Sequence, residues 1–405
     1  MATIALISHQ GFAAVNFRKT LIKLLVSKGH QVYVLAPDYK QEEMQSIRLF
    51  GATPVYYPLS RAGLNPIMDS ITTFRLFLIL HRLKVDVSFS FSVKPVIFGS
   101  LAAYLAGVKN IVSMIEGLGY IFTENVATKY TSAVKPNAGM LGLLTQACHW
   151  IDDRLNKKFL KILVKFLYKL SLSLSDRVIF LNSDDIDYFA SLNVIDASRC
   201  INLGGIGVDL TEWISVPIIA EPLTFIMVAR LLKEKGIYEY IDAIRLLKPA
   251  YPAIRFLLVG STDLNPGSLT AATLLEWVSE GLVEYPGHVD IKPWVAKSSV
   301  FVLPSYREGV PRSTQEAMAM GRPVITTDVA GCRETVVENV NGFLVPAGDA
   351  LSLAAAMQRF IRNPEAIETM GARSRAIAEV KFNSIDKDAM ILAQLLPFSE
   401  PEKLV

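Results

Sequence analysis

The sequence predicts an α/β protein of two Rossmann-like domains, each with a doubly wound parallel sheet, that face each other across a cleft. Apolar runs rich in Val, Ile, Leu and Phe alternate with amphipathic stretches along the whole chain. Most of these runs are continuous, as expected for parallel strands covered by helices on both faces. With 405 residues, the chain is also too long for one typical domain and favours two.

Strands are expected at the short runs of β-branched, aliphatic and aromatic residues. Helices are expected between them, for example at Asn16–Lys28, Ile67–His81 and Ile237–Leu247. The expected strands, in chain order, include Thr3–Ser8, Val32–Ala36, Thr53–Pro58, Val85–Phe91, Asn110–Ile115, Val178–Asn182, Thr224–Val228, Arg255–Val259, Val300–Pro304, Pro323–Thr327 and Gly342–Val345.

A glycine-rich turn indicates the boundary between the two domains. This turn, Gly204–Gly207, is followed by a polar stretch, and a new strand is expected from about Leu223. We therefore expect an N-terminal acceptor-binding domain over about 1–212 and a nucleotide-sugar-binding domain over about 213–384. Ligands of open α/β sheets bind at the carboxyl ends of the strands, so the cleft between the domains is the expected active site.

The composition and the cysteine pattern exclude some classes of function. The net charge is only +3, so the chain has no overall basic field of the kind that binds nucleic acid. Its three cysteines, Cys148, Cys200 and Cys332, form no CxxC pair and no zinc-site spacing. Reduced thiols in a cytoplasm are the simplest interpretation of this pattern.

No segment of the sequence resembles a membrane span or a signal peptide. The uncharged apolar run Pro95–Val108 is shorter than the about 20 apolar residues that a transmembrane helix needs, and we expect a buried helix there. The N-terminal Met1–Ser8 lacks a basic start and a small-residue cleavage site. The sequence therefore predicts a chain that does not cross a membrane.

The most informative motif lies in the second half of the chain. An expected strand ends at Pro304, a Gly/Pro turn follows, and a helix is expected to run to Gly321. Glu308 lies in the turn and Glu316 lies inside the helix. The amides of Gly309–Ser313 are expected at the helix N-terminus, where free N–H groups and the helix dipole suit a diphosphate.

A second element places two cations beside another helix N-terminus. Arg230 and Lys235 follow an expected strand, and Gly236 precedes the next helix. Two converging cations at such a place can hold a diphosphate without a metal ion. The element contains no Asp-x-Asp of the kind that metal-dependent transferases use.

Together these motifs resemble those of retaining GT-B glycosyltransferases, in particular glycosyltransferase family 4 with its Glu-x7-Glu pattern. Glu308 and Glu316 match this pattern, and Arg230 and Lys235 match the family's Arg…Lys-Gly element. Further segments resemble the branch that builds lipid-linked O-antigen, capsule and N-glycan precursors. These segments are Val15–Arg18, Leu59–Arg61, Val93–Pro95, Gly99–Ser100, Gly117–Tyr120, Ala330–Glu334 and Asn341–Pro346.

The resemblance implies roles for individual residues. Arg230 and Lys235 would hold the diphosphate and neutralise the leaving charge, and Glu308 would face the donor sugar. Glu316 would accept hydrogen bonds from the ribose hydroxyls. The remaining donor-binding candidates are the backbone of Gly309, Val310 and Pro311 at the sugar and phosphates, and Val283 and Tyr285 beside the base. The resemblance also implies a last helix, within about 385–405, that returns to the N-terminal domain.

The acceptor side departs from the family pattern. Many relatives carry a histidine after the fifth strand, where this chain has Glu116 followed by Gly117 and Gly119. Glu116 would face the reaction centre. The two glycines would have a role in the active site, would allow the chain to reverse direction, or both. Asn16 and Arg18 are expected to begin the first helix, either where an acceptor phosphate is met or as an ordinary surface helix start.

A basic amphipathic stretch, Arg154–Lys169, allows two interpretations. Its lysines recur at helical spacing on one side, and the remaining residues are mainly Phe, Leu, Ile and Val. Such a helix can lie on an anionic membrane surface. It can equally be a domain helix that buries its apolar face and solvates its lysines.

The resemblance implies transfer of a hexose or N-acetylhexosamine from a UDP-sugar to a polyprenyl-diphosphate-linked saccharide during surface polysaccharide (O-antigen or capsule) synthesis. No cofactor, no metal and no nucleic acid are expected. The chain would act as a peripheral protein on the inner face of the cytoplasmic membrane. The alternatives are a GT-B UDP-sugar 2-epimerase, which needs no acceptor, and a non-enzymatic glycan-binding module.

Overall fold

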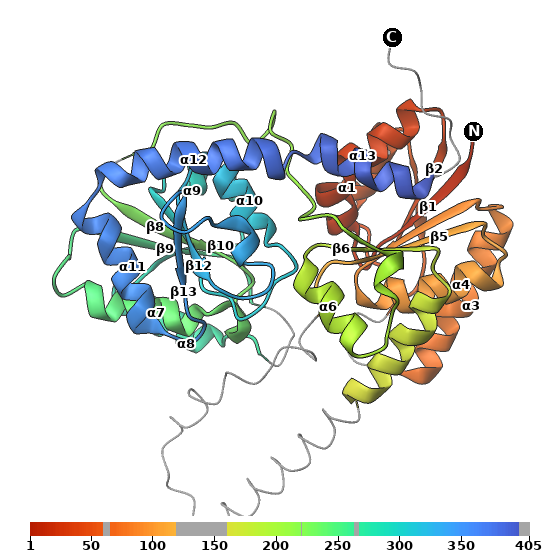
Figure 1. The fold of residues 1–405 in the computed structure, drawn as a ribbon, viewed down its shortest axis with the longest axis horizontal. Helices are drawn as coiled ribbons and strands as arrows, with labels where there is room; N and C mark the ends of the chain where they lie inside the picture. Colours follow the sequence, from red (N-terminus) through yellow and green to blue (C-terminus); the bar gives the residue numbers. More distant parts are fainter. Residues whose placement is uncertain (60–64, 119–159, 220, 263–266, 397–405) are drawn as a thin grey trace, which may run out of the picture. The chain divides into compact units, whose positions relative to one another are not determined.

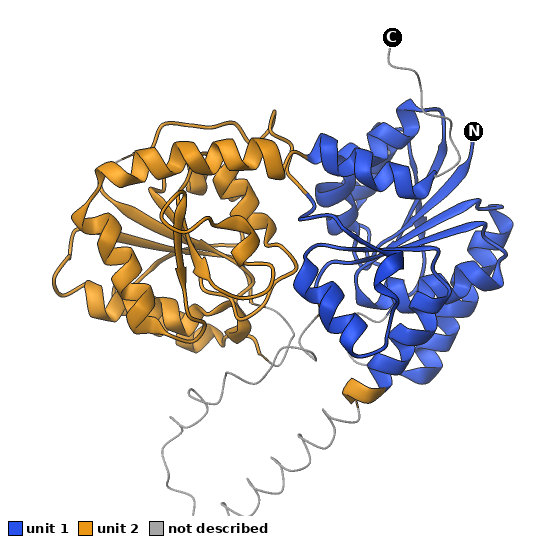
Figure 2. Ribbon diagram, in the orientation of Figure 1, with its two compact units in different colours: residues 1–117, 163–206, 384–405 blue, residues 118–162, 207–383 orange. Residues whose placement is uncertain are grey.

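A computed structural model describes residues 1–59, 65–118, 160–219, 221–262 and 267–396 (Figure 1). The chain divides into two compact units (Figure 2). Unit 1 comprises Met1–Gly117, Leu163–Ile206 and Ser384–Val405, and unit 2 comprises Leu118–Ile162 and Gly207–Asn383. The chain therefore enters the body of unit 2 at Gly207 and returns to unit 1 at Ser384.

Unit 1 contains a seven-stranded parallel sheet with the order β3-β2-β1-β4-β5-β6-β7. The order reverses between β1 and β4, which makes the sheet doubly wound. Most of its central residues are fully buried, as the continuous apolar runs predict. The strands are β1 (Thr3–Ile7), β2 (Gln31–Ala36), β3 (Thr53–Tyr56), β4 (Val87–Phe91), β5 (Asn110–Ile115), β6 (Arg177–Phe180) and β7 (Cys200–Asn202).

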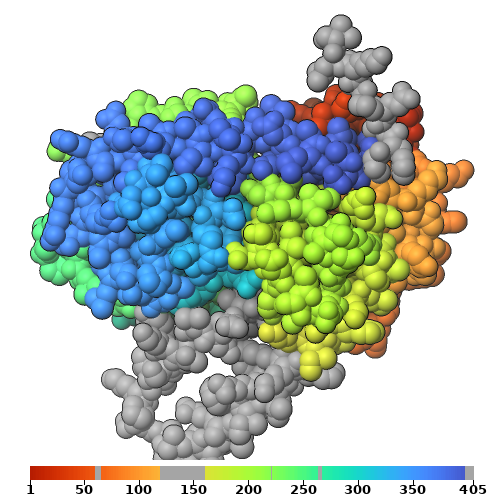
Figure 3. All heavy atoms as spheres, viewed as in Figure 1, coloured from red at the N-terminus to blue at the C-terminus, as the bar shows by residue number. Residues whose placement is uncertain are grey.

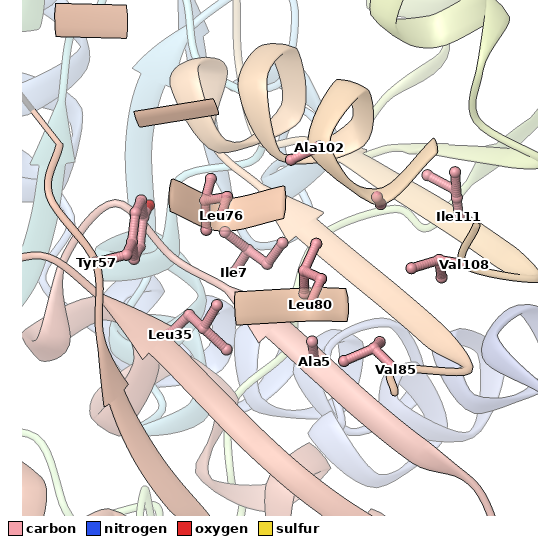
Figure 4. Close-up of a cluster of buried hydrophobic side chains, with 11 residues drawn as sticks. Ala5, Ile7, Leu35, Tyr57, Leu76, Leu80, Val85, Ala102, Val108 and Ile111 are labelled. Carbon is pink, nitrogen blue, oxygen red and sulfur yellow. The ribbon is translucent and has the colours of Figure 1, made fainter. Parts of the chain in front are cut away.

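Helices cover both faces of this sheet, because right-handed crossovers in opposite directions place helices on opposite faces. A buried cluster of Leu76, Leu80 and Ala102 with strand residues Ala5 and Ile7 joins α3 and α4 to one face (Figure 4). The helices are α1 (Gly11–Ser27), α2 (Gln41–Leu49), α3 (Pro66–Arg82), the π-helical η1 (Pro95–Gly99), α4 (Ser100–Leu105), a helix over 160–173, α6 (Ser183–Ser191), η5 (Ala197–Arg199) and α13 (Ser384–Leu395).

The first helix begins at Gly11, which is five residues before the predicted start at Asn16. The carboxylate of Asp38, which follows β2, accepts a hydrogen bond of 2.8 Å from the backbone N–H of Gly11. This cap comes from a residue that is distant in the sequence, so no local signal marks the start. Asn16 and Arg18 consequently lie within α1 and not at its beginning.

The helix predicted within Pro95–Val108 is confirmed by η1 and α4, and Pro95–Gly99 is buried throughout. Burial of the whole run is not confirmed, because Tyr104 and Leu105 at the end of α4 are exposed. In the described residues, no helix combines the length and the apolar character that a bilayer span requires. The described part of the basic stretch is helical and buries Val164 and Tyr168. Its first residues, including Lys157 and Lys158, lie outside the described residues.

Unit 2 contains a six-stranded parallel sheet with the order β10-β9-β8-β11-β12-β13. The two doubly wound units confirm the predicted α/β class of two Rossmann-like domains. The strands are β8 (Thr224–Val228), β9 (Arg255–Val259), β10 (Glu284–Gly287), β11 (Val300–Leu303), β12 (Val324–Thr327) and β13 (Gly342–Val345). The helices are η6 (Lys233–Lys235), α7 (Ile237–Leu247), α8 (Ala271–Ser279), α9 (Lys292–Ala296), α10 (Arg312–Ala319), η7 (Arg333–Thr335), α11 (Ala350–Arg362) and α12 (Glu365–Lys381).

Candidate active site

An ion pair between Lys235 and Glu308 lies at the carboxyl edge of the unit 2 sheet. The Nζ of Lys235 is 2.5 Å from Oε1 of Glu308, and both side chains are largely buried. The hydroxyl of Ser305 donates a second hydrogen bond of 2.7 Å to the same oxygen. Lys235 follows β8 and Glu308 follows β11, and these strands are neighbours. Adjacent carboxyl ends therefore bring together two residues that are far apart in the sequence.

Two glycines allow the loops at this edge to approach each other closely. Gly236 has φ +74°, and a Cβ there would lie 2.0 Å from the carbonyl oxygen of Pro304. Gly331 has φ +76°, and a Cβ there would lie 2.2 Å and 2.3 Å from the carbonyl oxygens of Gly309 and Glu308. Any side chain at either position would push away the loop that carries Glu308.

A buried carboxylate, Glu239, ties the same loop to α7. The hydroxyl of Tyr306 donates to Glu239 Oε1, and the backbone N–H of Tyr306 donates to the carbonyl oxygen of Glu234 at 2.9 Å. Burial raises the pKa of Glu239, although the Tyr306 hydroxyl opposes this shift. Neither residue was expected at the site from the sequence, in which the only signal is a carboxylate on the apolar face of α7.

Glu316 is buried inside α10, where its residue is 7% exposed. The Nε of Arg312, one turn earlier, donates to Glu316 Oε1 at 2.8 Å. Burial raises the pKa of Glu316, and the Arg312 guanidinium opposes this rise. Asp290 and Lys292, which follow β10, also act on this carboxylate electrostatically. Arg312, Asp290 and Lys292 were not expected at the site from the sequence.

The start of α10 joins the end of β8. The hydroxyl of Ser313 donates to the carbonyl oxygen of Val228 at 3.0 Å. Pro311 is the N-cap residue of α10, and Gly309 and Val310 immediately precede it. The side-chain amide of Gln315 donates to the carbonyl oxygen of Val310 at 3.1 Å and holds this segment in place. The predicted anion-binding amides thus lie at the same sheet edge as Lys235.

Arg230 lies two residues beyond the end of β8, at the same edge, and its side chain is exposed. The backbone N–H of Leu232 donates to the carbonyl oxygen of Arg230 at 2.7 Å, so the chain turns sharply between Arg230 and Lys235. The structure therefore places the two predicted cations on either side of one short turn.

Of the two residues predicted beside the base, only Tyr285 reaches this edge. Its hydroxyl donates to the carbonyl oxygen of Gly260, just beyond the carboxyl end of β9, at 2.8 Å. Val283 precedes β10, is buried, and lines a hollow with Ile254 and Arg255 at the amino end of β9. Val283 thus lies just before β10 and Tyr285 lies within it, and a contact of Val283 with the base stays a prediction.

In unit 1, Glu116 follows β5 and is held by two side chains. Arg18 of α1 donates to Oε1 of Glu116, and the hydroxyl of Ser92 donates to Oε2 at 2.6 Å. Ser92 follows β4 with φ +75°, a strained conformation for a residue with a side chain. The Arg18 guanidinium carbon lies 4.8 Å from the ring centre of Phe91.

The predicted position of Arg18 at the start of the first helix is wrong, since Arg18 lies within α1 and its residue is only 1% exposed. The helix begins earlier than expected, so Arg18 faces the sheet and pairs with Glu116. Asn16 is exposed on α1, and its side-chain amide donates to the carbonyl oxygen of Phe12 at 2.9 Å. Gly117 follows Glu116 directly, and Gly119 lies outside the described residues.

The comparisons with known proteins agree with these features. Residues 222–363 match the family described as glycosyl transferases group 1. The chain is 28% identical over 366 residues to the Campylobacter jejuni N,N'-diacetylbacillosaminyl-diphospho-undecaprenol alpha-1,3-N-acetylgalactosaminyltransferase, with 87% of each chain covered. It is 26% identical over 317 residues to the Escherichia coli UDP-Gal:alpha-D-GlcNAc-diphosphoundecaprenol alpha-1,3-galactosyltransferase, covering 78% of this chain and 75% of the relative.

Solved structures share the whole fold. The sucrose-phosphate synthase of Thermosynechococcus elongatus aligns with a TM-score of 0.73 at 19% identity, over 98% of this chain and 100% of the other. Anabaena HepE in complex with UDP-glucose aligns with a TM-score of 0.72 at 16% identity, with the same coverage. The relatives and the two-unit fold identify the chain as a glycosyltransferase with the GT-B fold, and its residues 222–363 match the group 1 family.

Proposed function

We propose that the chain transfers a hexose or N-acetylhexosamine from a UDP-sugar to a polyprenyl-diphosphate-linked saccharide in bacterial surface polysaccharide synthesis. The observation that carries this proposal is the cluster of Lys235, Glu308 and Ser305 beside the start of α10. The activities of the Campylobacter jejuni and Escherichia coli relatives support a donor of this type and a diphosphate-linked lipid acceptor.

The charges of the proposed donor site suit the departure of a nucleoside diphosphate. As the bond from the sugar to the diphosphate breaks, negative charge develops on the leaving oxygen. Lys235, Arg230 and the amides at the start of α10 would lie beside this oxygen and stabilise it electrostatically. These fixed groups supply the positive charge in the proposed mechanism, which uses no metal ion.

Glu308 and Glu316 would position the donor. Lys235 and Ser305 both bind Oε1 of Glu308, so its carboxylate is fixed where a sugar hydroxyl can donate to it. Glu316, which Arg312 holds in place, would accept hydrogen bonds from the two ribose hydroxyls. We propose retention of the anomeric configuration through attack of the acceptor on the face that the diphosphate leaves.

Glu116 is the proposed contact with the acceptor in unit 1. Arg18 and Ser92 each bind one of its oxygens and so fix the orientation of the carboxylate. A carboxylate held in this way can accept a hydrogen bond from the attacking hydroxyl. Asn16 and Gly117 complete the proposed acceptor side. The chain would act as a peripheral protein at the inner face of the cytoplasmic membrane, where polyprenyl-linked acceptors are anchored.

A transfer assay tests this function directly. The purified protein is incubated with radiolabelled UDP-sugars, one at a time, and a lipid extract of the source membranes, in the presence of EDTA. We expect label from one donor to enter the organic phase and the new linkage to retain the donor's anomeric configuration by NMR. Interconversion of free UDP-sugars without transfer would instead establish a 2-epimerase, and loss of transfer in EDTA would contradict the metal-independent mechanism.

A further inference from the structure

Helix α3 exposes a stripe of large apolar side chains along its outer face. Ile67, Ile71, Phe74 and Leu78 are 73%, 40%, 59% and 39% exposed. Their spacing of three or four residues places them on one side of the helix. The opposite side of α3 packs into the core (Figure 4), so this helix is apolar on two faces. Packing against the core explains the apolar residues on the buried face of α3 but not those on its exposed face.

The helix over 160–173 shows the same feature. Within unit 1, this helix buries Val164 and Tyr168, yet Phe166 is 62% exposed and Leu170 is 42% exposed. Phe166 and Leu170 are four residues apart and therefore share a face. A helix that served only the core would carry polar residues at these positions.

These exposed side chains lie on the same side of unit 1. In the strand order, α3, α4 and the helix over 160–173 connect β3 to β4, β4 to β5 and β5 to β6. Successive right-handed crossovers in one direction place all three helices on one face, in this order. The orange and yellow-green parts of the chain that contain them adjoin in Figures 1 and 3. Between the outer two, α4 exposes Tyr104 and Leu105 by 58% and 57%. We call the exposed apolar side chains of these three helices, within unit 1, the apolar surface.

Cations flank the apolar surface, and exposed carboxylates are absent from its described helices. Lys165 and Lys169 each precede an exposed apolar residue, and Arg75 and Arg82 lie beside the stripe of α3. The one acidic residue of α3, Asp69, is buried and paired with Lys94 Nζ at 3.0 Å. Neither α4 nor the helix over 160–173 contains Asp or Glu. A partner with negative charge and an apolar interior is therefore favoured.

We propose that the apolar surface docks unit 1 onto an anionic lipid bilayer. The apolar side chains would enter the boundary between headgroups and acyl chains, while the flanking cations would lie beside the lipid phosphates. A second copy of the chain fits this surface less well, because two copies would bring like charges together. The inference deepens the proposed function and rests on it for the need to reach a lipid-linked acceptor.

Flotation with lipid vesicles tests this docking surface in the full-length protein. We expect the wild-type chain to float with vesicles of phosphatidylcholine and phosphatidylglycerol, and more weakly with phosphatidylcholine alone. The double variant F74S/F166S removes two large apolar contacts and should lower partitioning at least about tenfold. The variant K165Q/K169Q should lower it about tenfold on the anionic vesicles only.

A matched control changes two exposed leucines of unit 2, Leu275 and Leu351, which are 67% and 70% exposed. L275S/L351S should float like the wild-type chain. The proposal is overturned if the wild-type chain does not float with anionic vesicles, or if F74S/F166S floats equally well. It is also overturned if F74S/F166S abolishes self-association in sedimentation without changing flotation, since a second copy would then cover the surface.

A separate readout distinguishes this inference from the proposed function. Transfer to an acceptor with a short, water-soluble prenyl chain needs no membrane, so F74S/F166S should retain the wild-type rate with it. A wild-type chain that floats with vesicles but transfers no sugar to any acceptor would contradict the proposed function and leave the docking surface intact. A wild-type chain that transfers sugar normally but does not float with vesicles would contradict the docking surface and leave the proposed function intact.

Discussion

At the scale of single residues, the burial of Glu316 sets the pH range over which the proposed ribose contact can form. Only the ionised carboxylate accepts hydrogen bonds from both ribose hydroxyls. Burial raises the pKa of Glu316 and Arg312 opposes this rise, so loss of Arg312 would raise the pKa further. When the solution is acidified, a variant without Arg312 should therefore lose donor binding at a higher pH than the wild-type chain does.

We expect Arg312→Gln to move the acidic limb of the kcat/KM profile upward by about one pH unit, measured with a fixed UDP-sugar and acceptor. Glu316→Gln should lower kcat/KM and remove this limb. Arg245→Gln, which removes an exposed arginine paired with Asp242 and Glu280, should leave the profile unchanged. An unaltered limb in Arg312→Gln would show that Glu316 does not control donor binding.

The pair of Tyr306 and Glu239 makes a second residue-scale prediction. Tyr306→Phe removes the donor to a buried carboxylate and should lower the free energy of unfolding by about 2 kcal/mol in urea titrations. Glu239→Gln keeps an oxygen that accepts from Tyr306 and removes a buried charge, so its cost should be smaller. The opposite order of the two variants would contradict the role of this pair in fixing the loop of Glu308.

At the scale of elements, the close approach of η6 to the end of β11 is testable at Gly236. Gly236→Ala places a Cβ 2.0 Å from the carbonyl oxygen of Pro304, whereas Gly281, with a similar φ of +67°, has nothing within 4 Å of its Cβ position. Both alanine variants should lose about 1 kcal/mol of stability from backbone strain. Only Gly236→Ala should also lose transfer activity, and equal activities would refute the importance of this contact.

The sequence predicts elements best where periodicity and burial agree. The strands Asn110–Ile115, Thr224–Val228, Arg255–Val259 and Gly342–Val345 have the predicted bounds. The two short edge strands β7 and β10 were missed, because three or four half-exposed residues give no continuous apolar run. Glu239 was missed for another reason: its pairing with Tyr306 depends on a tertiary contact that no local pattern records. Arg312 precedes Glu316 by four residues, so the sequence does carry the helical spacing of that pair.

At the scale of the whole molecule, the chain completes unit 1 with its last described helix. Helix α13 packs on α1 and β5, and the side-chain amide of Asn110 donates to the carbonyl oxygens of Gln394 and Leu395 at 2.9 Å and 2.8 Å. Ile391 is 1% exposed and its neighbour Met390 is 38% exposed. The C-terminal segment is therefore part of the core of unit 1.

We expect Ile391→Ala to lower the free energy of unfolding of unit 1 by about 3 kcal/mol, while Met390→Ala should cost much less. Unit 2 contains the proposed donor residues, so the affinity for UDP at a temperature where both units are folded should be unchanged in either variant. Thermal unfolding with and without UDP measures both effects. Equal destabilisation by the two variants would contradict the packing of α13.

The motifs of unit 2 allowed the sequence to predict the donor side in more detail than the acceptor side. Glu308, Glu316 and Lys235 lie in motifs whose spacing defines a strand, a turn and a helix. Arg18 and Glu116 instead come from α1 and the end of β5, and their pairing depends on a helix start that a distant aspartate determines. The pairing of Arg18 with Glu116, on which their proposed role at the acceptor depends, is therefore visible only in the structure.

The most direct test of the donor site compares Lys235→Ala with Lys233→Ala, a lysine in the same short turn η6. Loss of a fixed charge at the leaving oxygen should lower kcat for glycosyl transfer by about 10²–10³ in Lys235→Ala. The circular dichroism spectrum should be unchanged, and Lys233→Ala should keep nearly the wild-type rate. A wild-type rate in Lys235→Ala would show that the Lys235–Glu308 cluster is not the site of transfer.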